Sequence, residues 1–137
     1  SHLGLFKDDA GAIYVVCTNT DKLMKTTDGL SWQTINLPTI SSWNAGAYGN
    51  GKYVVLSNAG VAAISSDGVN WTMATIPVAA NRWYAMSYTD KFIALCGDTK
   101  QFGITSDDLA TTQTTYGAQT AVAQTSPFAA DLYLRIK

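Results

Sequence analysis

A repeat of about 40 residues constrains the fold of this chain more than any other feature of its sequence. Residues 26–38 read TTDGLSWQTINLP, residues 65–77 read SSDGVNWTMATIP, and residues 105–115 read TSDDLATTQTT. The aspartates that mark the three copies are 39 and 40 residues apart. A fixed period of this length indicates an architecture in which one small unit is repeated.

The repeat extends upstream of these segments. WNAGAYGNGKYVVLSNAGVAAISSDG aligns with WYAMSYTDKFIALCGDTKQFGITSDD, which places Trp43 opposite Trp83 and Tyr53 opposite Phe92. The first copy keeps AIYVVCTNTDKLMKTTDG but has little before it. We therefore expect its first strand to be truncated or donated from elsewhere.

Each unit divides into four short segments with strand-forming residues, separated by Asn, Asp and Gly. In the second unit the strands are predicted at about 43–48, 52–57, 61–66 and 71–76, and Asn50-Gly51 favours a tight hairpin between the first two. Four antiparallel strands in about 40 residues match the size of a β-propeller blade. The predicted fold is all-β, a single domain over residues 1–137. It has three four-stranded, propeller-blade-like units at about 5–38, 42–77 and 82–115, followed by a tail and a C-terminal strand in 116–137.

The turn between the third and fourth strands carries the sharpest motif. In SSDGVNW, the Asp67 carboxylate can accept hydrogen bonds from the backbone of its own turn, and Gly68 supplies a left-handed conformation. Trp32 and Trp71, four residues after each aspartate, are predicted to pack into the core. The third copy has Asp108 in place of the glycine, so its turn should be looser.

Composition excludes several kinds of catalytic site. All ten acidic residues are aspartates, and the only histidine is His2. Histidine-based triads, histidine-rich zinc sites and glutamate-dependent glycosidase sites therefore have no residues to form them. We predict no catalytic residues, no metal site and no cofactor. Lys7-Asp8-Asp9 suits a hard cation but lacks the spaced acidic ladder of a calcium loop.

The remaining composition argues against two classes of partner. The net charge is −1 and the charges are spread evenly, so no basic stripe is available for nucleic acid. No apolar run approaches the roughly 20 residues of a spanning helix, so membrane insertion is not expected. Cys17 and Cys96 lie in apolar runs and are interpreted as small buried residues, with a disulfide between them left open.

The aspartate motifs resemble the Asp-box, or BNR, repeat of sialidase-like β-propellers, although Gly29 and Gly68 stand one residue earlier than in that pattern. The shortened motif, the WYAMSYTDKFIAL segment and the final DLYLRIK are more similar to the repeats of bacteriophage tail and tail-fibre proteins and of some bacterial surface proteins. Sialidase chemistry as that family performs it needs an arginine triad and a glutamate. This chain has only Arg82 and Arg135 and no glutamate, so that activity is not expected.

Three units are too few for a conventional ring, because propellers close with typically four to eight blades. The chain could be part of a longer protein, several chains could assemble, or the units could stack in another β arrangement. We expect assembly into a homo-oligomer, because open flanks would expose apolar strands. A trimer is favoured and a dimer is the alternative.

Candidate ligand-binding residues are those that the copies do not share, or tryptophans at strand entries. Sugars stack on aromatic rings while polar side chains bind their hydroxyl groups. The recurrence of Trp43 and Trp83 also indicates packing, and polar loop tips are usually only solvated. The candidate set is Trp43, Asn44, Asn81, Arg82, Trp83, Tyr84, Asp98 and Lys100.

The resemblance and the composition together lead to one functional hypothesis. We expect a non-enzymatic receptor-binding tip of a bacteriophage tail fibre, located in the virion outside the host cell. Its partner would be a bacterial surface glycan or an outer-membrane protein. The alternative is a structural spacer or assembly module without a ligand of its own.

The first prediction follows from the Arg82 and Trp83 pair. Replacing both residues by alanine should abolish adsorption to host cells, because the change removes the aromatic platform and the guanidinium group together. Oligomer mass and thermal melting should not change. Undiminished adsorption of the double variant would remove this site from consideration.

Overall fold

The structure is a computed structural model, and it describes residues 4–75, 83–96, 101–106 and 114–117. Within these ranges the chain forms three four-stranded antiparallel sheets. The first sheet contains β1 (Gly4–Lys7), β2 (Ile13–Val16), β3 (Thr20–Thr26) and β4 (Gln33–Ser41). The second contains β5 (Trp43–Gly49), β6 (Lys52–Ser57), β7 (Val61–Ser65) and β8 (Thr72–Thr75). The third contains β9 (Trp83–Tyr88), β10 (Phe92–Cys96), β11 (Gln101–Ser106) and β12 (Thr114–Gly117).

Strand order in every sheet follows chain order. The strands predicted for the second unit are confirmed to within one or two residues, and the Asn50-Gly51 hairpin has the expected positive φ angles of 50° and 72°. The sequence predicts that the first strand of the first unit is truncated or donated from elsewhere. The donated alternative is wrong, because β1 of the same chain pairs with β2, and the described β1 is shorter, with four residues, than β5, with seven. The predicted strand at about 132–136 lies outside the described residues.

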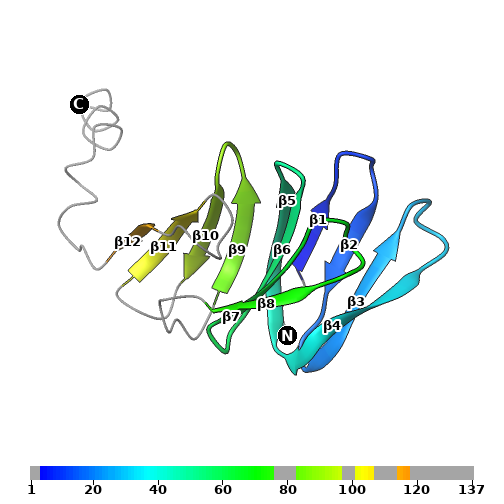
Figure 1. The fold of residues 1–137 in the computed structure, drawn as a ribbon, viewed down its shortest axis with the longest axis horizontal. Coiled ribbons are helices and arrows are strands. Elements are labelled where there is room, and N and C mark those ends of the chain that lie inside the picture. Colours follow the sequence, from blue (N-terminus) through cyan, green and yellow to red (C-terminus); the bar gives the residue numbers. More distant parts are fainter. Residues whose placement is uncertain (1–3, 76–82, 97–100, 107–113, 118–137) are drawn as a thin grey trace, which may run out of the picture.

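The second sheet lies between the other two (Figure 1). The first strands of the sheets approach one another, with β1 against β5 and β5 against β9. Two apolar clusters fill the spaces between sheets. One cluster joins the first and second sheets and includes Tyr14, Val16, Leu23, Tyr53 and Trp71. The other joins the second and third sheets and includes Ala47, Val54, Leu56, Phe92 and Ala94.

Burial differs between the middle sheet and the outer ones. Val54 and Val55 are adjacent on β6 and point to opposite faces, yet both are fully buried. On β10, Ala94 is fully buried while Leu95 is 49% exposed. Within the described part of the chain, the outer sheets therefore pack through one face, and the middle sheet packs through both.

The sheets approach closely where glycine meets an aromatic ring. A side chain on Gly46 of β5 would come within 2.5 Å of the Phe6 ring of the first sheet. A side chain on Gly49 would overlap the Tyr88 ring of the third sheet. Glycine at these two positions lets rings from both neighbouring sheets lie directly on the β5 backbone.

A difference in strand register turns Tyr14 toward the second sheet. Thr26 and Ser65 occupy equivalent turn positions, but Thr26 pairs with Ile13 whereas Ser65 pairs with Tyr53. Since a shift of one residue reverses the face of a side chain, Tyr14 and Tyr53 point at each other across the interface instead of in the same direction. Their ring centroids are 5.3 Å apart.

A buried carboxylate connects these two tyrosines. Asp8, only 5% exposed, follows β1. Its Oδ2 accepts hydrogen bonds from the hydroxyls of Tyr14 at 3.2 Å and Tyr53 at 3.0 Å, and its Oδ1 accepts one from the Ala12 amide at 2.9 Å. Burial raises the pKa of both phenols, so they remain protonated donors. Asp8 thereby links the first sheet to the second.

The second prediction tests this link. Tyr53→Phe should lower the free energy of unfolding by about 1.5–3 kcal/mol, because a hydrogen bond to a buried charged group is lost. Urea denaturation followed by circular dichroism measures the change. Tyr48→Phe is the matched control, since Asp9 has a larger effect than Asp8 on the pKa of the Tyr48 hydroxyl and the Tyr48 ring is only half-buried. Equal losses in the two variants would contradict the proposed role of Asp8.

Candidate functional site

The candidate site is built around the turn between β7 and β8, residues Ser65–Trp71, here called the second aspartate turn. The Asp67 Oδ1 accepts hydrogen bonds from the backbone amides of Val69 and Asn70, both at 2.8 Å. The Asp67 Oδ2 accepts one from the Asn70 side chain at 2.8 Å. Gly68 has a φ of 75°, and its amide donates to the Ser65 hydroxyl. The predicted turn geometry is confirmed.

The turn between β3 and β4, residues Thr26–Trp32, repeats this arrangement and is called the first aspartate turn. Asp28 accepts from the amides of Leu30 at 2.8 Å and Ser31 at 2.7 Å, and Gly29 also has a φ of 75°. Backbone hydrogen bonds hold the pKa of Asp28 and Asp67 below the usual range of aspartate. The corresponding turn of the third unit lies outside the described residues.

The two tryptophans of these turns differ in environment. Trp71 is 9% exposed and packs in the cluster between the first and second sheets, with its ring 6.3 Å from that of Tyr53. Trp32 is 47% exposed, so the prediction that it is a core residue is wrong. The physical reason is positional. Trp71 packs toward the preceding sheet, and no described sheet precedes the first one.

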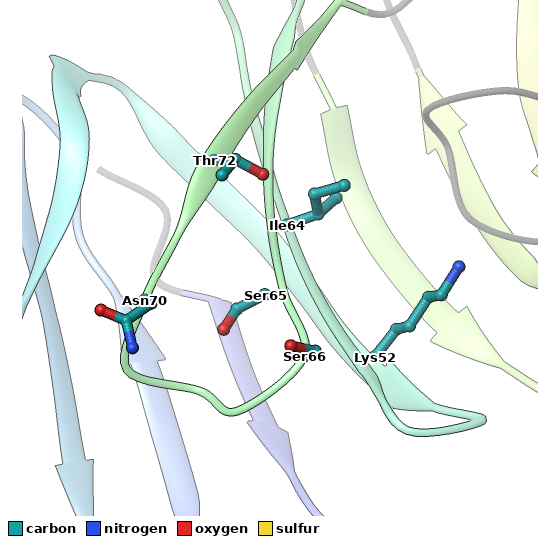
Figure 2. Close-up of a pocket in the computed structure, with 6 residues that line it drawn as sticks. All are labelled: Lys52, Ile64, Ser65, Ser66, Asn70 and Thr72. Atoms are coloured by element: carbon teal, nitrogen blue, oxygen red, sulfur yellow. The ribbon is translucent and has the colours of Figure 1, made fainter.

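A pocket of about 330 Å³ opens beside the second aspartate turn. Figure 2 shows Lys52 and Ile64 extending to one side of the second sheet and Asn70 at the turn. Its lining combines an ammonium group, hydroxyl groups, an amide and one aliphatic side chain, from Lys52, Ile64, Ser65, Ser66, Asn70 and Thr72. We call this the turn pocket.

A second hollow, of about 460 Å³, lies on the other side of the same turn. Gln33, Thr34 and Asn36 of β4 line it together with Asn70 and Trp71. Asn70 therefore borders both hollows, and its position is held by the bonds to Asp67. Both hollows combine neutral hydrogen-bonding groups with apolar side chains, which are Ile64 in the turn pocket and Ile35, Val69 and Trp71 in the second hollow, and the turn pocket adds the Lys52 ammonium. Such a mixture suits a hydroxyl-rich ligand.

The structure buries two of the ligand-binding residues that the sequence indicated. Trp43 is fully buried, and Asn44 is 4% exposed. With its amide oriented to satisfy both ends, Asn44 donates to the Ser42 carbonyl at 3.1 Å and accepts from the Asn58 side chain at 2.7 Å. The burial favours the packing role that recurrence indicated for Trp43. Asn44 is among the residues that line a hollow of about 210 Å³ beside β1, β5 and β9, and its side-chain amide is engaged by Ser42 and Asn58.

The other candidates are not brought to one place by the described structure. Trp83 and Tyr84 begin β9, and Trp83 pairs with Cys96 as Trp43 pairs with Ser57. Asn81, Arg82, Asp98 and Lys100 lie outside the described residues. Their roles remain predictions.

Sequence reasoning missed the turn pocket, although one signal was available. Asn70 corresponds to Ser31 in the first copy and to Ala110 in the third, so it meets the test of being peculiar to one copy. Lys52 gave no such signal, because Lys91 occupies the corresponding place in the third copy. Only the fold brings Lys52, the first residue of β6, next to the turn.

Three further observations concern the described residues. Cys17 is a free, half-buried thiol. No group of three or more histidine, cysteine or acidic side chains there could hold a metal ion, and Asp8 is occupied by the two tyrosines and the Ala12 amide. That part of the chain also contains no helix with the length and apolar character to span a membrane.

The third prediction follows from the depressed pKa of Asp67. A carboxyl whose pKa is lower in the folded state stabilises the fold above the unfolded pKa, and this contribution disappears as the pH falls through the folded pKa. Asp67→Asn should therefore unfold more easily than wild type at pH 7, and the difference should narrow as the pH falls below about 4. Urea denaturation across this pH range measures it. A difference that is independent of pH would refute the proposed electrostatic role of the carboxylate.

Comparison with known proteins places the fold but not a family. No protein-family model and no curated protein matches the chain. Similar solved structures include YCF48 bound to a D1 peptide (TM-score 0.67, 14% identity, 84% of this chain and 39% of that one). A streptogramin B lyase matches with a TM-score of 0.70 and 16% identity, over 86% of this chain and 41% of that one. A glutaminyl cyclase from Myxococcus xanthus matches with a TM-score of 0.58 and 14% identity, over 90% of this chain and 56% of that one. The chain thus spans about two fifths of the first two proteins. These neighbours are β-propeller-type repeat proteins, and the likeness shows that this chain has a propeller-type all-β fold.

Proposed function

We propose that this chain is a non-catalytic recognition module of a bacteriophage tail fibre, and that its turn pocket binds a bacterial surface glycan. The three sheets are taken as propeller blades that form one face of a larger assembly. The observation that carries the proposal is the lining of the turn pocket. An ammonium group, hydroxyls and an amide surround a single aliphatic side chain there.

The pocket combines a mainly apolar surface with a few hydrogen-bonding groups, which suits the C–H faces and the hydroxyls of a sugar. Lys52, Ser66 and Thr72 present groups that can bond to hydroxyls, and Ile64 presents an apolar surface for C–H groups. The hydrogen bonds within the second aspartate turn hold Asn70 in place before a ligand arrives, which reduces the entropy lost on binding.

Catalysis has little support in the sequence. The chain has no glutamate, and its only histidine is His2, so general acid–base chemistry would depend on aspartate, tyrosine, lysine or cysteine. Asp67 and Asp28 are engaged in their turns, and Asp8 is buried among its partners. The lyase and cyclase among the structural neighbours share the fold at 16% and 14% identity, which is a likeness of fold alone.

A single open pocket of this size would bind a sugar weakly. Several copies presented to one cell surface would gain affinity by avidity, because each later contact is effectively intramolecular. Multivalent display is therefore part of the proposed mechanism.

The fourth prediction tests the turn pocket directly. Lys52→Met combined with Thr72→Val removes the ammonium and one hydroxyl while keeping the aliphatic parts of both side chains. Binding to purified bacterial lipopolysaccharides and capsular polysaccharides, immobilised as a panel, should weaken by about tenfold or more for a polysaccharide that wild type retains. Lys7→Met, an exposed lysine of β1, is the matched control and should bind as wild type does.

The other outcomes of this experiment separate the alternatives. Unchanged binding by the pocket variant, with loss in the Arg82→Ala and Trp83→Ala double variant, would move the site to the start of β9. No binding of wild type to any polysaccharide, together with no competition by excess protein against phage adsorption, would replace the proposal by the spacer function.

A further inference from the structure

The outer face of the third sheet repeats a face that is buried elsewhere in the molecule. Leu95 pairs with Ala85 across β10 and β9, as Leu56 pairs with Ala45 across β6 and β5. Leu56 is fully buried against the third sheet, whereas Leu95 is 49% exposed. The same type of residue at the same position thus has a packing partner in one sheet and no described one in the other.

We call this surface the leucine face. Its described members are Ala85, Ser87, Ile93 and Leu95. Ile93 pairs with Ser87 as Val54 pairs with Ala47, so the alternation along the strands is also repeated. On the second sheet, the corresponding residues form one side of the cluster shared with the third sheet.

The outer face of the first sheet repeats the opposite, buried face of the second sheet. Val15 pairs with Met24 as Val55 pairs with Ala63. Val55 and Ala63 are fully buried against the first sheet, whereas Val15 and Met24 are only partly buried.

Trp32 extends this surface, which we call the tryptophan face. Strand pairing gives Ile13, Val15 and Met24 as members, and Trp32 is assigned to it by its correspondence with Trp71. Trp32 corresponds to Trp71, and the exposed fraction of the indole rises from 9% at Trp71 to 47% at Trp32. The first sheet therefore presents the surface that the second sheet uses to pack on its predecessor.

Both internal interfaces join the same two kinds of face in the same order along the chain. The tryptophan-bearing face of the second sheet packs on the first sheet, and the face of the second sheet that bears Leu56 packs on the third. Among the described residues, one face of each kind has no packing partner, the tryptophan face on the first sheet and the leucine face on the third. Packing of two tryptophan faces or of two leucine faces would not reproduce an internal interface. Packing of a tryptophan face on a leucine face would reproduce one.

We propose that the tryptophan face of one copy of this chain packs on the leucine face of a second copy, head to tail, and that two copies close a ring of six sheets. Two copies bring the number of sheets within the four to eight at which propellers typically close, and three copies would bring nine. Burial of the apolar residues of the two faces would favour this association. The leucine face also contains Ser87, and two lysines share the side of the first sheet that bears the tryptophan face: Lys7, which pairs with Ile13, and Lys22, which contacts Asn36 and Asp21. The proposal concerns assembly and holds whether or not the turn pocket binds a glycan.

The fifth prediction is an oligomeric state that depends on both faces. Sedimentation equilibrium of the wild-type chain should give twice the chain mass of 14.6 kDa. Trp32→Asp and Leu95→Asp should each give a monomer, because a charge would be buried at both interfaces of the ring. Far-UV circular dichroism and thermal melting establish that each variant is folded.

Leu30→Asp is the matched control. Leu30 lies in the same turn as Trp32 and is 86% exposed. Its counterpart Val69 stays 57% exposed although the second sheet is packed on both sides, so this position lies outside an interface of this kind. The Leu30→Asp variant should remain a dimer.

Mixing the two interface variants tests the head-to-tail arrangement. A dimer of one Trp32→Asp chain and one Leu95→Asp chain retains one unmodified interface, so the mixture should dimerise at concentrations where each variant alone is monomeric. A wild-type monomer or trimer would overturn the proposal. A monomer would indicate that other segments of the same chain cover the two faces. Dissociation by Trp32→Asp but not by Leu95→Asp would also overturn it, because it would indicate pairing of two tryptophan faces.

Discussion

Burial of the second sheet on both of its faces holds the described part of the chain together. Side chains that alternate along its strands belong to two apolar clusters, and each cluster is shared with one neighbouring sheet. Apolar burial is the main favourable term in folding, and here it acts between sheets, since each sheet by itself has only backbone hydrogen bonds and cross-strand pairs. The glycines of β5 allow this packing to be close, because aromatic rings from both sides lie against its backbone.

A polar contact adds specificity to one of these interfaces. Asp8 brings a carboxylate into the space between the first two sheets, where Tyr14 and Tyr53 donate to it from opposite sides. A buried carboxylate is costly without such partners, so a sliding of the two sheets would leave unpaired polar groups. The register shift of β2 is what turns Tyr14 toward this carboxylate.

The aspartate turns have a local role and a consequence for the site. Each carboxylate satisfies amides of its own turn, so the turn keeps its shape largely by contacts within a few residues. The second turn stands between two hollows, and its Asn70 borders both. A rigid turn beside a mixed polar and aliphatic surface is a suitable support for ligand recognition, and the same turn in the first sheet carries Trp32 at an open face.

The sequence by itself determined the repeat, the four strands of the second unit, the Asn50-Gly51 hairpin and the bonding within the first two aspartate turns. These features depend on contacts between residues close in the chain, so residue type and spacing are enough to predict them. Tertiary structure decided which face of each strand is covered. Trp32 and Trp71 have the same local motif, but of the two only Trp71 packs against a neighbouring sheet in the described structure. The sequence indicated Trp43 as a candidate ligand platform, but the fold buries it fully. The neighbours of Asp8 and Lys52 come from strands that are distant in the sequence, so only the tertiary structure shows them. Whether a side chain is buried depends on a neighbouring sheet that covers it, and a local sequence pattern contains no information about whether such a sheet is present.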